Sequence, residues 1–132
     1  MALVFAFIVH EKPTTKKNHM QVVRGRLLPS KQYREYEARA IPYCPKLGID
    51  YPVNVEVHYY MPTRRKVDIT NLESAILDVM VKAGTLADDN CTIVVSTDGS
   101  RVHYDKEHPR TEVIITTSED MDKEFLNVKG GR

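Results

Sequence analysis

The stretch RKVDITNLESAILDVMVKAGTLADD, residues 65–89, holds the clearest structural pattern in the chain. Its apolar residues recur three and four positions apart, which predicts a helix with one face buried in a core. Thr70 and Glu73 fit a capping box at the start of this helix, and Gly84 stands where a left-handed glycine commonly ends one. The expected buried stripe is Leu72, Ala75, Ile76, Val79, Met80 and Ala83.

Aspartates flank both ends of this predicted helix. Asp68 precedes the expected N-cap by two residues, and Asp88 and Asp89 come just before a strand-like run at 91–96. Carboxylate oxygens are the ligands that Mg²⁺ prefers, and a bound cation relieves the repulsion between adjacent carboxylates. We therefore predict a metal site built from Asp68, Asp88 and Asp89, which binds Mg²⁺ and accepts Mn²⁺ as a substitute.

The reach of the chain limits how these carboxylates can meet. A helix over residues 71–83 is about 20 Å long at 1.5 Å per residue. The six residues from Gly84 to Asp89 span at most about 20 Å when extended. Asp89 therefore reaches Asp68 within one chain only if the return loop runs antiparallel along the helix. The alternative is that a second subunit supplies one of the carboxylates.

The predicted helix also offers a polar flank. Asn71, Ser74 and Asp78 fall on the same side when the apolar stripe faces the core. Asn71 is suited to bind a phosphate or a metal-bound water, and Asp78 is suited to support the metal site from behind. Alternatively, Asp78 is a surface carboxylate that pairs with Lys82 four residues later. The capping-box residues, Thr70 among them, are also explained by helix capping alone.

The rest of the chain predicts a single α+β domain over residues 1–132, since this length suits one domain. We expect a mixed sheet of about four strands packed against two helices. A second helix follows an N-cap at Ser30 and ends before Pro42. Residues 13–29 are predicted to be an irregular basic loop, and residues 118–132 a charged tail that frays. Strands are expected at 3–9, 51–60, 91–96, 101–104 and 112–117, with a turn at Asp98-Gly99.

The net charge of +1 hides an uneven distribution. Up to Lys66 the chain carries 12 Lys and Arg against 5 Asp and Glu, a balance of +7, and the remainder carries 7 against 13, a balance of −6. A basic arm beside an acidic patch suits a protein that holds phosphates and a metal, although chance segregation on a solvated surface is the alternative. The basic candidates are Lys16, Lys17, Arg24, Arg26, Arg64, Arg65 and Lys66.

Several functional classes lack sequence support. The apolar run at 1–9 is shorter than the roughly 20 residues that span a bilayer, so we expect no membrane segment. Two cysteines do not make a disulfide framework, which favours a reducing cytoplasm. The five histidines lack zinc-type spacing, and no glycine-rich phosphate loop predicts a nucleotide cofactor.

The middle of the chain resembles the RusA family of endodeoxyribonucleases. The resemblance is carried by residues 65–72, Asp78, residues 82–84 and the Asp88-Asp89 pair. The resemblance is strong over about the middle third of the chain. It implies a Mg²⁺-dependent homodimer, of phage or prophage origin in a bacterial cytoplasm, that resolves Holliday junctions in DNA recombination and repair. By position, Asp68 matches the first catalytic aspartate of the family, Asp89 matches the later one, and Asn71 matches the family asparagine.

Two positions depart from the family pattern. Thr70 stands where the family has a second catalytic aspartate, and Ser74 stands where it has a lysine. A missing carboxylate weakens a metal site and a missing ammonium removes a phosphate contact, so Asp88 becomes a candidate ligand. The resemblance implies a metal-dependent nuclease that makes paired cuts in four-way junctions. The alternatives are a catalytically weakened protein that binds branched DNA, and a phage accessory protein without a metal.

Overall fold

Strand β4 (Val53–Met61) lies at the centre of the sheet in the computed structural model, which describes residues 2–16 and 21–117. Its antiparallel neighbour β7 (Arg110–Thr117) pairs in turn with β1 (Ala2–Val9), which forms one edge. On the other side of β4 lie two short parallel strands, β5 (Val94–Ser96) beside its start and β6 (Arg101–Tyr104) beside its end. The sheet is therefore mixed, as predicted.

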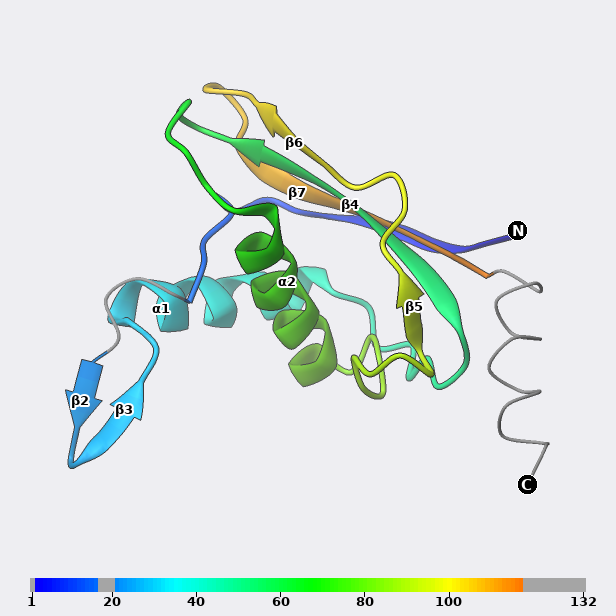
Figure 1. Ribbon diagram of the computed structural model, residues 1–132, viewed down its shortest axis with the longest axis horizontal. Helices are drawn as coiled ribbons and strands as arrows, with labels where there is room; N and C mark the ends of the chain where they lie inside the picture. The colour runs from blue at the N-terminus through cyan, green and yellow to red at the C-terminus, as the bar shows by residue number, and fades with distance from the viewer. Residues whose placement is uncertain (1, 17–20, 118–132) are drawn as a thin grey trace.

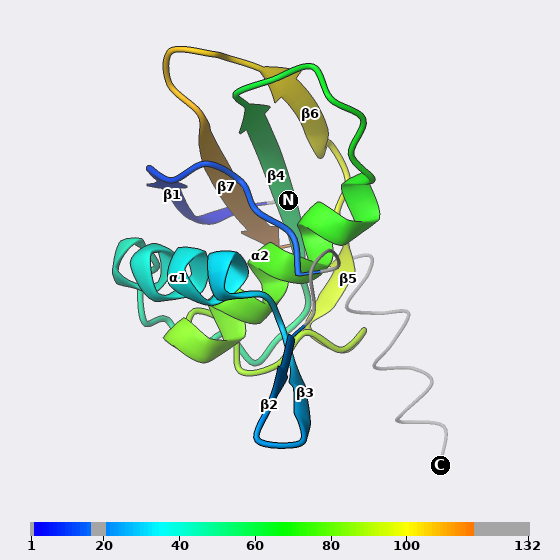
Figure 2. The same ribbon diagram turned by 90° about the vertical axis from the view of Figure 1, so that its left-hand side faces the viewer.

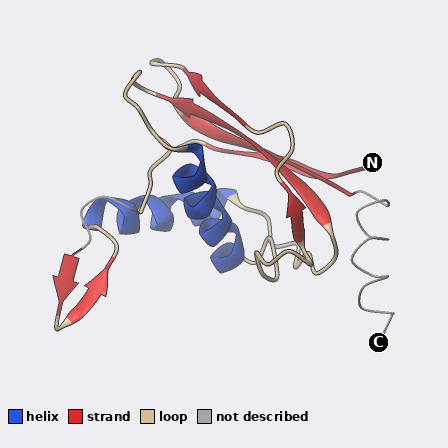
Figure 3. Ribbon diagram, in the orientation of Figure 1, coloured by secondary structure: helices blue, strands red, loops and turns tan. Residues whose placement is uncertain are grey.

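Both helices cover the same face of this sheet (Figures 1 and 3). Helix α1 (Lys31–Ala40) begins at Ser30, whose Oγ accepts a 3.1 Å hydrogen bond from the Tyr33 backbone amide, so the predicted N-cap is confirmed. A short 3₁₀ turn, η1 (Ile41–Tyr43), follows α1. Helix α2 (Ile69–Ala83) ends at Gly84 in the left-handed conformation, with φ of 84°, as the sequence predicts. The α+β fold of a mixed sheet against two helices is confirmed.

The core lies between the helices and the inner face of β4 and β7. Alternate residues of β4 point inward, which is why the strand alternates so clearly in sequence. The predicted apolar stripe of α2 is buried in full. From the sheet, the buried apolar side chains are Val9, Val53, Val55, Val57, Tyr59, Val113 and Ile115, and from α1 they are Tyr33, Tyr36 and Ala40.

The basic segment before α1 contains a hairpin that the sequence analysis did not predict. Strands β2 (Gln21–Val23) and β3 (Arg26–Leu28) pair antiparallel and project away from the sheet and helices (Figure 2). Arg24 and Gly25 connect them with φ values of 51° and 76°. Two positive φ values in a two-residue connection match the right-handed twist of a hairpin. The prediction of an irregular loop is therefore wrong over residues 21–28.

Other boundaries shift less. β5 covers only the second half of the strand predicted at 91–96, and β7 starts two residues before its predicted range. Gly99 has a φ of 89° within the predicted turn. The predicted charged tail at 118–132 lies outside the described residues. Among the helices that the structure describes, none has the length and apolar character needed to cross a membrane.

Candidate active site

Asp68 is the N-cap of α2. Its backbone oxygen accepts hydrogen bonds from the amides of Asn71 at 3.1 Å and Leu72 at 3.3 Å, while its side chain makes no capping bond. The carboxylate is exposed, and its one side-chain contact among the described residues is with the Asn71 amide, at a long 3.4 Å. An anion here is stabilised by the positive end of the helix dipole. Asp68 is thus a free carboxylate held at a defined position.

The predicted capping box is wrong. Thr70 lies inside the first turn of α2, because the helix starts at Ile69 and takes Asp68 as its cap. Ile69 is partly buried and packs against the core, which extends the helix beyond the point that the local pattern favours. Thr70 and Ser74 are both exposed. The two positions that depart from the expected motif therefore present hydroxyl groups to solvent on the first turns of the helix.

Asp88 and Asp89 lie in the loop after α2, and their side chains differ. Asp88 is occupied locally, since one carboxylate oxygen accepts from the Asp89 amide at 2.7 Å and the other from the Asn90 side chain at 3.0 Å. The Asp89 carboxylate is exposed and makes no hydrogen bond within the described residues. Of this pair, Asp89 is the carboxylate with both oxygens available for a ligand.

One chain does not bring Asp68 and the Asp88-Asp89 pair together. Helix α2 has 15 residues and is about 22 Å long, with Asp68 at its start and the pair beyond its end. The loop after α2 does not return along the helix, because Leu86 pairs with Ile49 and the Ala87 amide donates to the Ile49 oxygen at 2.8 Å. Among the described residues, no group of three or more Asp, Glu, His or Cys side chains is arranged to hold a metal ion.

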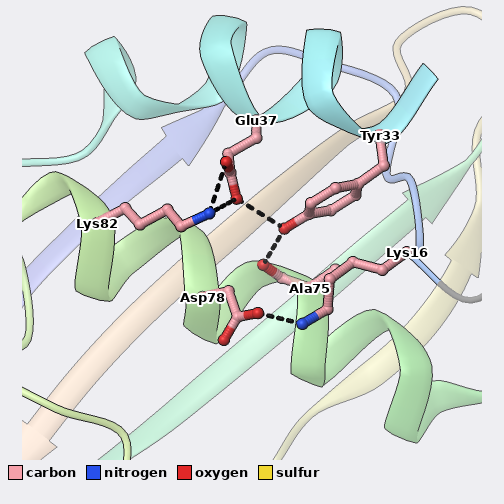
Figure 4. Close-up of polar contacts among 6 residues, drawn as sticks. All are labelled: Lys16, Tyr33, Glu37, Ala75, Asp78 and Lys82. Carbon is pink, nitrogen blue, oxygen red and sulfur yellow. Dashed lines mark hydrogen bonds and ion pairs between the residues drawn. The ribbon is translucent and has the colours of Figure 1, made fainter. Parts of the chain in front are cut away.

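Asp78 and Lys16 form an ion pair between α2 and the segment after β1 (Figure 4). Asp78 therefore does not pair with Lys82, as one interpretation of the sequence expected. Lys82 instead donates to both carboxylate oxygens of Glu37 on α1, at 2.9 and 3.0 Å. The Tyr33 hydroxyl lies within hydrogen-bonding distance of Glu37 Oε2, at 3.1 Å, and of the Ala75 backbone oxygen, at 3.3 Å. These contacts hold α1 against α2.

The other predicted DNA contacts fall into two groups. Arg24 and Arg26 are exposed on the β2–β3 hairpin, and Lys17 lies outside the described residues. Arg64, Arg65 and Lys66 are exposed on the link between β4 and α2, directly before Asp68. The Arg64 guanidinium stacks on the Tyr104 ring, 4.1 Å from its centre. The second group precedes Asp68, the N-cap of α2, by two to four residues in the chain.

Sequence reasoning missed a cluster of polar rings on the outer face of the sheet. His58 and His103 are joined between Nδ1 and Nε2 at 2.8 Å, and the Tyr60 ring stacks on His103 at 4.4 Å. The Arg110 guanidinium covers the other side of Tyr60, 3.8 Å from its centre. The alternation of polar residues along β4 was the available signal, but strand pairing with β6 and β7 brings the partners together.

The comparisons with known proteins identify relatives over most of the chain. The family model described as Endodeoxyribonuclease RusA matches residues 11–116. A protein of Aquifex aeolicus named crossover junction endodeoxyribonuclease RusA is 33% identical over 90 residues, which cover 64% of this chain and 71% of that protein. Proteins of the same name from Escherichia coli K12 and from Enterobacteria phage 82 are each 33% identical over 81 residues, covering 58% of this chain and 68% of theirs.

Proposed function

Since the chain belongs to the RusA family of endodeoxyribonucleases, we propose that it resolves Holliday junctions by cutting the DNA backbone. The resemblance found in the motif is confirmed by the family match, which spans residues 11–116 and contains Asp68, Asp88 and Asp89. This match carries the proposal. A phage protein among the relatives supports a role in the recombination of phage or prophage DNA, in the cytoplasm of the bacterial host.

The proposed metal is Mg²⁺, with Mn²⁺ as a substitute, held by Asp68 and Asp89. The donor set fits, because Mg²⁺ is commonly bound by one or two carboxylates and keeps several waters. Asp68 and Asp89 are exposed, and neither is held by a short hydrogen bond from its own chain among the described residues. When bound, Mg²⁺ supplies charge neutralisation at the phosphodiester and a more acidic water. Asp88, tied to Asn90, supports the position of Asp89.

We propose that two chains complete each site in a homodimer. The separation of Asp68 from Asp89 by the length of α2 supports this arrangement, because it keeps the two carboxylates of one chain apart. A two-fold dimer would take Asp68 from one chain and Asp89 from the other, and would do so twice. Two equivalent sites suit a four-way junction, in which two strands are cut.

Asn71 and the cations around Asp68 have separate roles in this proposal. Asn71 contacts the Asp68 carboxylate through its side-chain amide, so it orients the carboxylate. Arg64, Arg65 and Lys66 precede Asp68 and hold the DNA backbone near it by charge. Arg24 and Arg26, on the projecting hairpin, are placed to contact a second part of a branched substrate.

One observation favours a second candidate function, a junction-binding protein that cuts weakly. Thr70 and Ser74 are exposed on the first two turns of α2, at positions where the motif of the family has a carboxylate and an ammonium. A hydroxyl group cannot carry the charge of either. In this alternative the protein binds four-way junctions with strong salt dependence and yields little product with Mg²⁺ or Mn²⁺.

A cleavage assay on a synthetic four-way junction separates the two candidates. The resolvase cuts two strands with Mg²⁺, cuts nothing with a chelator, and loses cutting but keeps junction binding when Asp89→Asn is introduced. Asp50→Asn is the matched control, because it makes the same change at an exposed aspartate that is not a proposed ligand. Undiminished cutting by Asp89→Asn would overturn the assignment of this aspartate, and tight binding without any product would favour the second candidate.

A further inference from the structure

A cavity of about 290 Å³ opens where three segments meet beside the start of α2. The segment after β1 contributes residues 12–15, the first turn of α1 contributes Ser30 and Gln32, and the link from β4 to α2 contributes Met61 to Thr63 and Arg65 to Val67. Val67, the last of these, directly precedes Asp68. The cavity therefore adjoins the proposed active site, but it is built from different side chains.

The walls of this cavity carry positive charge. Lys12, Arg65 and Lys66 line it, and none of the lining residues that the structure describes is an Asp or Glu. No salt bridge of these three lies within the described residues, whereas Lys16 pairs with Asp78 and Lys82 with Glu37. Unpaired cations gathered around a concave surface attract an anion.

Hydroxyl and amide donors complete the lining. Thr15 and Thr63 supply hydroxyl groups, while the Thr14 hydroxyl, also in the lining, donates to the Lys12 backbone oxygen at 2.9 Å and can still accept. Ser30 is 5% exposed, and because its Oγ accepts from the Tyr33 amide, its hydroxyl proton remains available to donate. The cavity also faces the N-terminal turn of α1, where backbone amides and the helix dipole favour a negative group.

We propose that this cavity holds the backbone phosphate next to the one at Asp68, on the strand that is cut. Three cations, several hydroxyls and a helix N-terminus match the charge and acceptor-rich surface of a phosphate, and the apolar side chains of Met61 and Val67 provide a surface for the adjoining sugar. The inference rests on the proposed function for its position along the strand. It adds Lys12, Thr14 and Thr15, which lie outside the basic residues expected from the sequence.

Binding to four-way junctions that carry one uncharged methylphosphonate tests the proposal. The junction is labelled for fluorescence anisotropy, the neutral linkage is moved one position at a time around the cut, and a chelator prevents cutting. We expect one position next to the cut at which neutralisation weakens binding of the natural protein. The variant with Lys12→Gln and Arg65→Gln should bind the unmodified junction more weakly and should no longer respond at that position.

Salt dependence gives a second measure of the same contact. The double variant should lower the slope of log K against log salt by roughly 1 to 2, because about 0.9 is lost for each phosphate charge neutralised by the protein. Lys46→Gln is the matched control, an exposed lysine that does not line the cavity. Lys66→Gln alone is a milder variant, and thermal unfolding verifies that each protein is folded.

The outcomes separate this inference from the proposed function. A double variant that still responds to every methylphosphonate as the natural protein does, or that behaves like Lys46→Gln, overturns the phosphate cavity even if cutting is normal. If the response instead follows a 5′-terminal phosphate in nicked junctions, the internal phosphate is the wrong ligand. Failure to cut any junction with Mg²⁺ would overturn the proposed nuclease function. The methylphosphonate response would still show whether the cavity binds a phosphate.

Discussion

Lys16 and Asp78 form an ion pair that joins the segment after β1 to the middle of α2. The sequence suggests separate tasks for these residues, a DNA contact for the lysine and support of a metal for the aspartate. In the folded chain each neutralises the other. Their side chains are about one third exposed, at 32% and 34%, so the pair contributes less than about 1 kcal/mol to stability.

We predict that this pair withholds Lys16 from DNA. Lys16→Gln should leave the salt dependence of junction binding nearly unchanged, whereas Lys66→Gln should lower the slope of log K against log salt by about 0.9. In a protein that already carries Asp78→Asn, Lys16→Gln should lower this slope, because Lys16 is then free to contact a phosphate. Anisotropy titrations across a salt series measure the natural protein and the four variants, and an equal drop in slope from Lys16→Gln in both backgrounds would contradict the prediction.

Mixed dimers test whether two chains share each site. Asp68→Asn and Asp89→Asn should each abolish cutting alone. When the two variants are mixed and exchanged, a shared site predicts one intact pair of carboxylates per mixed dimer, and so single nicks in the junction. A site contained in one chain predicts no product at all, because every chain then lacks one aspartate. Denaturing gels of a labelled junction distinguish these results, with each variant alone as the control.

Replacing Thr70 and Ser74 by the residues of the family pattern should raise the rate of junction cutting. Thr70→Asp with Ser74→Lys places a carboxylate and an ammonium on the exposed first turns of α2, beside Asp68. Each extra transition-state contact of this kind is worth roughly 3 kcal/mol, or about 100-fold, in a favourable geometry. We expect the single-turnover cutting rate to rise by at least tenfold, with little change in junction affinity. A lower rate would mean that Thr70 and Ser74 are themselves part of the working site.

The ring cluster on the outer face predicts a pH-dependent stability. Partial burial and the nearby His58 hold the pKa of His103 below its ordinary value. The unfolded chain therefore binds this proton more readily, so the stabilisation is complete above the unfolded pKa of about 6.5 and is lost as pH falls through the lower folded pKa. The other charged or polar groups around His103 are Arg101, Arg110, Glu112 and Tyr60, with Glu56 on the far side of His58.

Thermal unfolding between pH 8 and pH 5 measures this effect. The midpoint should fall toward pH 5 in the natural protein, and His103→Gln should flatten that part of the curve. His108→Gln is the control, because His108 is exposed and lies outside the ring cluster. A curve that keeps its slope in His103→Gln would assign the pH dependence to other groups.

The two cysteines should differ sharply in reactivity. Cys44 is 8% exposed, and burial raises the pKa of its thiol to about 11, so little reactive thiolate forms near neutral pH. Cys91 is exposed in the loop after α2. A thiol reagent at pH 8 should modify one equivalent quickly and the second only on unfolding. Cys91→Ser should remove the fast phase, and a fast phase that survives in this variant would contradict the buried position of Cys44.

The helical part of the site could be predicted because its signals are local. The apolar spacing of α2 and the glycine that ends it lie within a few turns of one another, and both are confirmed. The predicted start of α2 was two residues too late, because Asp68 and Thr70 are both good N-cap residues. Burial of Ile69 decides between them, and that burial depends on the rest of the core.

The parts that were missed depend on contacts between distant residues. Leu86 follows Ile49 by 37 positions (86 − 49), yet their pairing turns the loop with Asp89 away from Asp68. No local pattern distinguishes this path from a return along the helix. The hairpin is a different case, because Val-Val-Arg-Gly-Arg-Leu-Leu contains two short apolar pairs around a glycine. The high content of basic residues obscured that signal.

Helix α2, which lies between Asp68 and the loop that holds Asp89, is about 22 Å long. In a dimer in which each site takes Asp68 from one chain and Asp89 from the other, the length of this helix would set the distance between the two sites, and so the distance between the two cuts. One added turn would lengthen the helix by about 5.4 Å, and it would leave the buried stripe facing the core because a full turn returns the side chains to the same face. In such a dimer, the spacing of the incisions on the two strands would depend on the number of turns in α2.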